Sequence, residues 1–220
     1  MEPTSRKYLF FDLDGTLTDS MPGIARAVQY ALRRFGIDVQ DLAALKPFLG
    51  PPLRDSFMEF YGMSPEEADR AVAVSREYFV PRGMFENELY PGIPELLAAT
   101  AAAGRVNVIA TSKPQPFAER IAAHFGIDRH FRLISGSTFD GRRKTKADVI
   151  HHALSALGIA PGEAVMIGDR RHDVEGAAEE GLPAIAVEWG YAPPGELEAA
   201  RPLRIVPDVE TLRRLLLGNE

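Results

Sequence analysis

Two carboxylates, Asp12 and Asp14, follow an apolar run and are the strongest chemical signal in the sequence. The run Tyr8–Phe11 contains only aromatic and aliphatic residues, which is typical of a buried strand in a parallel sheet. Residues two apart in a strand point to the same side, so both carboxylates can face one site. Like charges held close together repel, and Mg²⁺, which prefers carboxylate oxygens, would relieve that repulsion. The alternative is a strand end followed by an ordinary Asp-Gly turn.

Two hydroxyls and a lysine follow a second apolar run. Val106–Ala110 is the run, and Thr111-Ser112-Lys113 comes directly after it. Ligands of open α/β folds bind at the carboxyl ends of the strands, so these side chains are placed to serve a ligand. Ser112 could instead be the N-cap of the next helix, with Gln115 as its partner, and the two roles are compatible.

A second pair of acids follows a third apolar run, Ala164–Ile167. Gly168-Asp169 ends this run, and Asp173 lies four residues beyond Asp169. Two more carboxylates are therefore expected at the same edge of the sheet as the first pair. The structural alternative is that the stretch Asp169-Arg170-Arg171-His172-Asp173 forms surface ion pairs and caps a helix.

Lys146 has an unusual place at the start of a predicted helix. Thr145 is a plausible N-cap and Asp148 is the third helical residue, so Lys146 falls in the first turn, where the helix dipole disfavours a cation. A neighbouring carboxylate or phosphate would explain the lysine, and a phosphate would also suit the free N–H groups. Lys144 is the competing candidate, and the basic stretch 142–146 could also be a solvated turn.

The order of predicted elements indicates an α/β fold with a helical insertion. From residue 90 onward strands alternate with helices, which predicts a doubly wound parallel sheet with right-handed crossovers. Residues 20–82 show only helical patterns. We therefore expect an α/β core of residues 1–18 and 86–220, and a helical cap domain of residues 19–85 that is placed to cover the carboxyl end of the sheet. The predicted strands are 8–11, 106–110, 131–135, 164–167, 184–187 and 204–206, and the predicted helices are 21–35, 53–61, 65–80, 94–103, 116–125, 146–157, 172–180 and 209–217.

Length, charge and composition exclude several classes of protein. The chain has 220 residues, enough for one α/β domain with a smaller insertion, and its formal net charge of −6 disfavours a general nucleic-acid binder. The absence of cysteine excludes disulfides, thiolate zinc sites and cysteine nucleophiles. No signal-peptide pattern is present, and no apolar run approaches the roughly 20 residues of a membrane span. We expect a cytoplasmic monomer or homodimer without nucleic-acid or membrane partners.

The order and spacing of these motifs resemble the haloacid dehalogenase-like hydrolases, in particular their phosphatase branch with a Rossmann-like core and a helical cap after the first motif. Residues 12–17, with the sequence DLDGTL, resemble the first motif, Thr111 the second, Lys146 the third, and Gly168-Asp169 with Asp173 the fourth. The family's common Lys-Pro-x-Pro third motif reads KADV here, so the choice between Lys146 and Lys144 stays open. Together with the loop FLGPPL at residues 48–53, these motifs look most like phosphoglycolate phosphatases and related nucleotidases.

The resemblance implies a two-step hydrolysis of a small phosphorylated metabolite. Asp12 would be the nucleophile that forms an aspartyl-phosphate, and Asp14 the general acid and base. Thr111 and Lys146 would hold the phosphoryl oxygens.

The resemblance also implies a Mg²⁺ cofactor and a set of substrate contacts. Mg²⁺ would bind the side chains of Asp12, Asp169 and Asp173, the last directly or through water, and the backbone carbonyl of Asp14. Arg54 could reach a second anionic group of the substrate, or be a surface residue of a cap helix. The expected substrate contacts are Gly15, Ser112 and Lys113 in the core and Gly50 and Arg54 in the cap.

Other functions remain open from the sequence. A dehalogenase has no leaving alcohol to protonate, so Asp14 argues against that activity. A phosphonate hydrolase of the family needs a Schiff-base lysine in the cap, where Lys46 is the only lysine between residues 20 and 85. A phosphosugar mutase would share every core residue named above. A non-catalytic phosphoryl-binding module would not need the proton donor.

Overall fold

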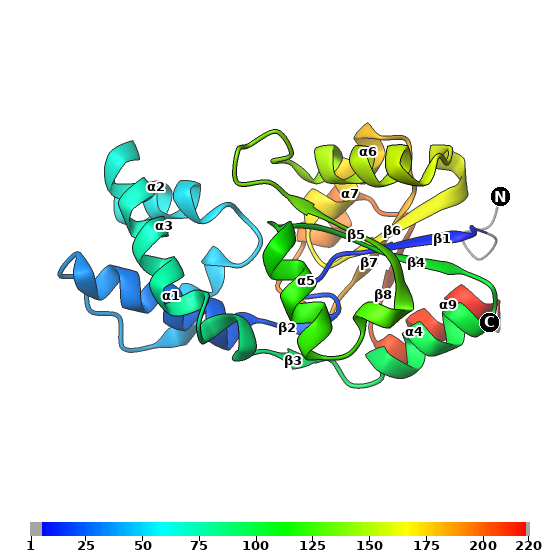
Figure 1. Ribbon diagram of the computed structural model, residues 1–220, viewed down its shortest axis with the longest axis horizontal. Helices are drawn as coiled ribbons and strands as arrows, with labels where there is room; N and C mark the ends of the chain where they lie inside the picture. Colours follow the sequence, from blue (N-terminus) through cyan, green and yellow to red (C-terminus); the bar gives the residue numbers. More distant parts are fainter. Residues whose placement is uncertain (1–5, 219–220) are drawn as a thin grey trace. The chain divides into compact units, whose positions relative to one another are not determined.

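The computed structural model describes residues 6–218, which form two compact units (Figure 1). The larger unit combines the chain up to Thr18 with the chain from Leu89 onward, and the smaller unit is Asp19–Glu88. The chain passes between the units at two short strands, β2 (Thr18–Asp19) and β3 (Glu88–Leu89), which pair with each other. The sequence did not predict these strands, because two residues are too few to show a periodicity.

A six-stranded parallel sheet is the framework of the larger unit (Figure 1). Its order, β5-β4-β1-β6-β7-β8, places β1 between β4 and β6, with Phe10 in register with Val108 and Met166. This is the doubly wound α/β architecture that the alternation of strands and helices predicted. The strands are β1 (Tyr8–Phe11), β4 (Val106–Pro114), β5 (Phe131–Ser137), β6 (Ala164–Gly168), β7 (Ala184–Val187) and β8 (Arg204–Val206).

Helices cover both faces of this sheet. Figure 1 shows α6 and α7 on one side of it and α4 and α9 on the other. On the α6–α7 side, Phe10, Val108 and Met166 pack in one buried cluster with Ile150 and Ala177. Burial of both faces explains why the strand sequences are continuous apolar runs rather than alternating ones. The helices are α4 (Ile93–Ala102), α5 (Gln115–His124), α6 (Lys146–Leu157), α7 (Arg171–Glu179), α8 (Glu196–Ala200) and α9 (Val209–Leu217).

The smaller unit is helical, with its own buried core. Val28 and Leu32 of α1 pack in one apolar cluster with Phe57 of α2 and Ala71 of α3. Ser64 begins α3 with the expected capping box, in which its hydroxyl and the Glu67 carboxylate each accept a backbone N–H. The α-helices are α1 (Met21–Arg34), α2 (Leu53–Tyr61) and α3 (Pro65–Phe79), and 3₁₀ segments lie at Leu42–Phe48 and Gly83–Phe85.

Helix α5 begins later in the chain than it would if Ser112 were its N-cap. β4 continues through Pro114, which is in register with Ser137 of β5, and α5 begins only at Gln115. Proline disfavours helical backbone in the residue before it, so Pro114 keeps the chain extended at Lys113, past Ser112. Ser112 is thus a strand residue, and the capping interpretation is wrong.

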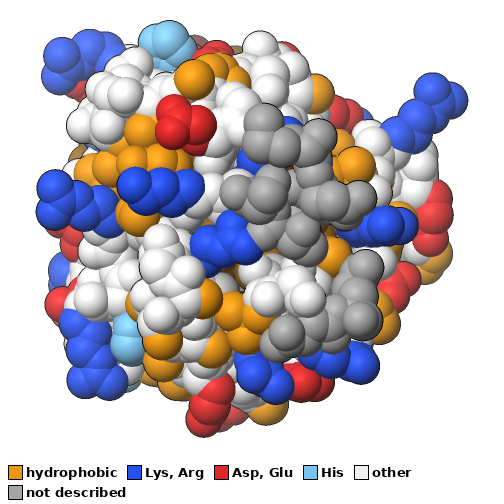
Figure 2. Space-filling view, turned by 90° about the vertical axis from the view of Figure 1, so that its right-hand side faces the viewer, with side chains coloured by type: hydrophobic (Ala, Val, Ile, Leu, Met, Phe, Trp, Pro, Cys, Tyr) orange, Lys and Arg blue, Asp and Glu red, His pale blue; other side chains and the backbone are white. Residues whose placement is uncertain are grey.

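Figure 2 shows the end of the larger unit where the chain begins and ends. Basic side chains are spread over this face among acidic and apolar ones. At the start of β4, the Arg105 guanidinium donates to the carbonyl oxygens of Arg6 and Leu216, which ties three segments together. Within residues 6–218, no helix combines the length and apolarity needed to cross a bilayer.

The capping box formed by Thr145 and Asp148 at the start of α6 is expected to stabilise the folded protein. Thr145 accepts the N–H of Asp148, whose carboxylate in turn accepts the N–H of Thr145. Thr145→Ala should lower the free energy of unfolding by about 1 kcal/mol because one N–H of the first turn loses its partner. Thr145→Ser should stay close to the wild type. Urea denaturation of the three proteins measures the difference, and equal midpoints for Thr145→Ala and the wild type would contradict this role.

Candidate active site

Asp12 is held in one orientation where β1 ends. Its N–H donates to the carbonyl oxygen of Ile167 (2.9 Å), which extends the pairing with β6 by one residue. Its Oδ1 accepts the N–H of Leu13 (2.8 Å). The carboxylate is 13% exposed, so it is accessible while its neighbours are buried. A partly exposed carboxylate fixed by the backbone is suited to react with a bound ligand.

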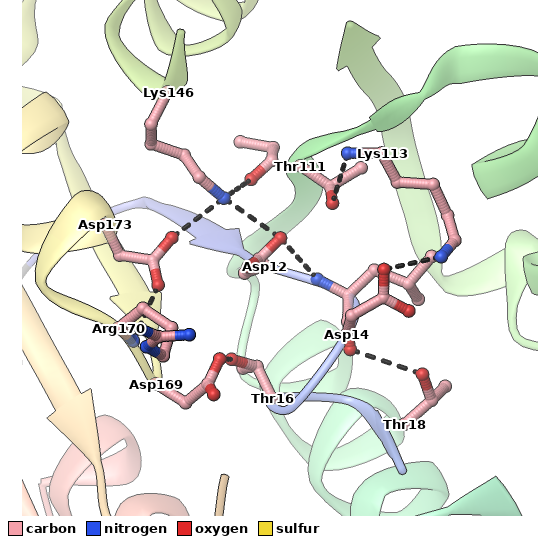
Figure 3. Close-up of polar contacts among 12 residues, drawn as sticks. Asp12, Asp14, Thr16, Thr18, Thr111, Lys113, Lys146, Asp169, Arg170 and Asp173 are labelled. Atoms are coloured by element: carbon pink, nitrogen blue, oxygen red, sulfur yellow. Dashed lines mark hydrogen bonds and ion pairs between the residues drawn. The ribbon is translucent and has the colours of Figure 1, made fainter. Parts of the chain in front are cut away.

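Lys146 lies between two of the acids (Figure 3). Its Nζ is 2.9 Å from Asp12 Oδ1 and 2.8 Å from Asp173 Oδ1, and it donates to the carbonyl oxygen of Ala110 (3.0 Å). Burial by itself lowers the pKa of Lys146, but the charges of Asp12 and Asp173 raise that pKa above its ordinary value. Lys144 is exposed. The geometry therefore favours Lys146 over Lys144 as the lysine of the site.

Asp12, Asp169 and Asp173 form a cluster of carboxylates. Each offers one oxygen, and these three oxygens lie within 4.8 Å of one another. Burial and the charges of Asp173 and Asp12 raise the pKa of Asp169 well above its ordinary value. Burial also raises the pKa of Asp173 to about 6, although Lys146 acts in the opposite direction. Without a cation nearby, these carboxylates lose their protons less readily than ordinary ones. Such a cluster of oxygen donors is chemically suited to a hard divalent cation.

Neighbouring backbone and hydroxyl groups fix the two buried acids. Asp169 Oδ1 accepts the Thr16 hydroxyl (3.2 Å) and Oδ2 accepts the Tyr191 N–H (2.8 Å). Asp173 Oδ2 accepts the Arg170 N–H (3.0 Å). Gly15 has φ +80°, and a Cβ there would lie 2.3 Å from Asp169 Oδ2. Glycine is required at this position by both the left-handed backbone and the approach of the carboxylate.

Asp14 does not share the surroundings of Asp12. Its Oδ2 lies 2.5 Å from the Nζ of Lys113, and the two side chains are 19% and 5% exposed (Figure 3). The strand periodicity predicted that Asp12 and Asp14 face one cation, but β1 ends at Phe11 and a turn follows. The two acids therefore have different partners. The sequence predicts a substrate contact for Lys113 and does not predict this ion pair.

The other expected site residues are placed as follows. Thr111 is buried near the end of β4, where its Oγ1 accepts the N–H of Lys113 (3.2 Å), and Ser112 is half-buried beside it. The Gly15 N–H donates to the Thr18 carbonyl (2.8 Å), so it already has a partner other than a phosphate. The larger unit thus brings together the core residues of the predicted site, namely Asp12, Asp14, Gly15, Thr111, Ser112, Lys113, Lys146, Asp169 and Asp173.

Two expected substrate contacts, Gly50 and Arg54, belong to the smaller unit. The Arg54 Nε is 2.7 Å from Asp69 Oδ1, and its Nη1 contacts the sulfur of Met58 (3.6 Å). The Arg54 side chain is 43% exposed. These contacts favour the alternative in which Arg54 is a surface residue of its helix.

The Asp169 loop is supported by an ion pair between Arg170 and Glu196. The sequence did not suggest Glu196 as the partner. Arg170 Nε lies 2.7 Å from Glu196 Oε1, and the same oxygen accepts the N–H of Arg171 (3.0 Å). Both side chains of the pair are almost buried, at 12% and 13% exposure. The pair joins the start of α7 to α8, and no local pattern in the sequence connects these segments.

Comparison with known proteins agrees with the motifs and the fold. Residues 9–187 match the haloacid dehalogenase-like hydrolase family. A 5′-nucleotidase from Pseudomonas aeruginosa is 47% identical over 94% of this chain and 94% of its own length. The tyrosine-protein kinase PtkA of Mycobacterium tuberculosis is 42% identical over 85% of this chain, which spans 64% of that protein. The crystal structure of a predicted phosphatase from Clostridium acetobutylicum has a TM-score of 0.93 at 45% identity, covering 97% of this chain and 99% of that one. Phosphoglycolate phosphatases are among the more distant relatives.

The carboxylate cluster predicts how stability responds to pH and to a divalent cation. The pKa of Asp169 and the pKa of Asp173, which is about 6, are raised in the folded protein above the ordinary value of 3.8. The stability that protonated carboxylates provide is therefore present at low pH and lost as pH rises through about 6 in metal-free protein. Divalent cations bind ionised rather than protonated carboxylates, so we expect a divalent cation such as Mg²⁺ to stabilise the protein more at neutral pH than near pH 5.

Thermal unfolding in chelator and in excess Mg²⁺ measures this effect. At a Mg²⁺ concentration about 100 times the dissociation constant, the stabilisation should be about 2.7 kcal/mol at neutral pH. Asp169→Asn is the control, and its unfolding temperature should respond little to Mg²⁺. An equal Mg²⁺ effect at both pH values in the wild type would contradict the role of the cluster.

Proposed function

The chain belongs to the haloacid dehalogenase-like hydrolase family, and we propose that it is a Mg²⁺-dependent phosphatase of a small phosphorylated metabolite. One observation carries the proposal: the buried Lys146 lies between Asp12 and Asp173, while Asp14 has a separate partner, Lys113. A carboxylate beside an ammonium group can attack phosphorus, and a second carboxylate with its own partner can transfer protons. Hydrolysis of a phosphomonoester requires both functions.

Asp12 is the nucleophile in the proposed mechanism. The Leu13 N–H and the Lys146 ammonium both contact its Oδ1, which restricts the carboxylate to one orientation. Attack of this carboxylate on phosphorus forms an aspartyl-phosphate and expels the alcohol of the substrate. Lys146 reduces the repulsion between the carboxylate and the phosphate. Attack of water on the same phosphorus then releases inorganic phosphate and restores Asp12.

Asp14 transfers the proton in each step. It protonates the oxygen of the leaving alcohol in the first step and accepts a proton from the attacking water in the second. The Lys113 ammonium, 2.5 Å away, holds the Asp14 carboxylate in place. Lys113 therefore positions Asp14 in this mechanism, in addition to the substrate contact expected from the sequence.

The remaining core residues bind the phosphoryl group and the metal. Thr111 and Ser112, at the end of β4, are proposed to hold phosphoryl oxygens together with Lys146. Bound Mg²⁺ would supply positive charge to the transferring phosphoryl group. Its proposed ligands are the side chains of Asp12, Asp169 and Asp173 and the backbone carbonyl of Asp14, and the three side chains offer oxygens that fit one cation.

A 5′-nucleoside monophosphate is the first substrate to test, and phosphoglycolate is the second. The similarity to a 5′-nucleotidase extends over nearly the whole length of both proteins, whereas the phosphoglycolate phosphatases are more distant. A phosphosugar mutase would use the same core residues and remains an alternative within the fold.

Phosphorylation of tyrosine is a second candidate function, and the similarity to PtkA is the observation that favours it. Transfer from ATP to a hydroxyl and transfer from a phosphomonoester to water are both displacements at phosphorus, so a similar set of residues can serve either. Hydrolysis is preferred here because the 5′-nucleotidase is the more similar of the two, at 47% against 42% identity, and matches 94% of this chain against 85% for PtkA.

The nucleophile is tested by Asp12→Asn. The variant should lose activity by about 10³-fold or more because an amide cannot form the covalent intermediate. Its fold should be retained, since removing one of several like charges relieves repulsion. Steady-state hydrolysis of an aryl phosphate and far-UV circular dichroism measure the two effects. The control is Asp128→Asn, which changes an exposed acid of the same unit and should retain full activity. Full activity in Asp12→Asn would exclude the mechanism.

The substrate class is tested by a screen of phosphorylated metabolites. The screen should include nucleoside monophosphates, phosphoglycolate, sugar phosphates and a phosphonate, each with Mg²⁺ and with chelator. We expect phosphate release from a nucleoside monophosphate that stops in chelator. Incubation with labelled ATP is the parallel assay for self-phosphorylation. Label incorporation without phosphate release from any monoester would favour the kinase instead.

A further inference from the structure

The segment that follows β7 contacts the Asp169 loop and contains Trp189, the only tryptophan of the chain. The indole N–H of Trp189 donates to the carbonyl oxygen of Thr16 (3.1 Å). The hydroxyl of the same Thr16 donates to Asp169 Oδ1 (3.2 Å). Thr16, a residue of the first motif, therefore connects the indole of Trp189 to the carboxylate of Asp169. No local sequence pattern relates Trp189 to Asp169.

The two residues after Trp189 contact Asp169 directly. The Tyr191 N–H donates to Asp169 Oδ2 (2.8 Å), so both carboxylate oxygens have a donor. A Cβ at Gly190 would lie 2.3 Å from the Cβ of Asp169. Only a residue without a side chain allows the backbone of this segment to lie so close to the acid. Residues 189–191 therefore determine where the Asp169 carboxylate points.

The position of the indole is itself restrained. The rings of Trp189 and Tyr90 meet edge to face with centroids 6.4 Å apart. The Tyr90 N–H donates to the carbonyl oxygen of Leu17 (3.1 Å). Two consecutive carbonyls of the first-motif turn, those of Thr16 and Leu17, thus accept hydrogen bonds from residues 189 and 90. This arrangement restrains the backbone that carries the Thr16 side chain, whose hydroxyl donates to Asp169.

We propose that Trp189 is a positioning residue for Asp169. Trp189 acts through Thr16, whose hydroxyl orients the Asp169 carboxylate toward a divalent cation. The inference rests on the metal site of the proposed function. Mg²⁺ demands near-octahedral geometry, and partners that orient a ligand contribute to metal affinity. The indole N–H does not contact the phosphoryl site residues, so its loss should weaken metal binding without changing the chemical step.

The test replaces one group of one side chain. Trp189 is the only tryptophan, so expression with 3-benzothienylalanine, an isostere with sulfur in place of N–H, changes this position alone. The Mg²⁺ dissociation constant, measured by calorimetry, should rise about 3- to 10-fold. At saturating Mg²⁺, kcat and KM should stay within about twofold of the wild type, since the chemistry uses other residues. Trp189→Phe should reproduce the result if the analogue is incorporated poorly.

Tyr90→Leu is the matched control, because it removes the ring contact and keeps the indole N–H. Its Mg²⁺ affinity should fall by less than that of the Trp189 analogue, because the indole keeps its hydrogen bond to Thr16. The proposal is overturned if the analogue and Trp189→Phe bind Mg²⁺ as the wild type does, or if Tyr90→Leu weakens binding equally. A wild type that binds no Mg²⁺ by calorimetry would overturn the metal site itself, which distinguishes failure of the proposed function from failure of this inference.

Discussion

Repulsion among buried carboxylates is the constraint on which this site depends. Asp12, Asp169 and Asp173 bring three acidic groups together where water is largely excluded, and Lys146 contacts two of them. Two like charges about 4 Å apart cost about 4 kcal/mol at the effective dielectric constant of a protein. Burial, together with this repulsion, raises the pKa values of Asp169 and Asp173. The fold keeps this unfavourable cluster because the same charges can hold a cation and a reactive carboxylate in place.

The parallel sheet concentrates the charges at one edge. β1 lies between β4 and β6, so the residues that follow these three strands are neighbours although they are distant in the chain. Helix α6 then directs Lys146 from its first turn toward the same point, where nearby acids compensate for the unfavourable helix dipole. Each charged group is therefore located by the end of a regular element, which makes the geometry rigid.

Asp12 and Asp14 have different partners because β1 ends at Phe11, before both of them. Had the strand continued, both side chains would have faced one side, as strand periodicity requires. Because a turn follows Phe11 instead, Asp12 forms an ion pair with Lys146 and Asp14 forms one with Lys113. In the proposed mechanism the first acid attacks phosphorus and the second transfers protons.

The sequence by itself indicated the α/β class, the helical insertion and the acids of the site, because strand ends, helix caps and motif spacing are local properties. It identified Asp12, Asp169 and Asp173, and it narrowed the lysine to Lys146 or Lys144. Only the tertiary structure favoured Lys146, paired Lys113 with Asp14, and placed Trp189, Tyr191 and Glu196 around the Asp169 loop. These contacts join segments that are far apart in the chain, and they depend on strand register and helix packing, which local patterns do not specify.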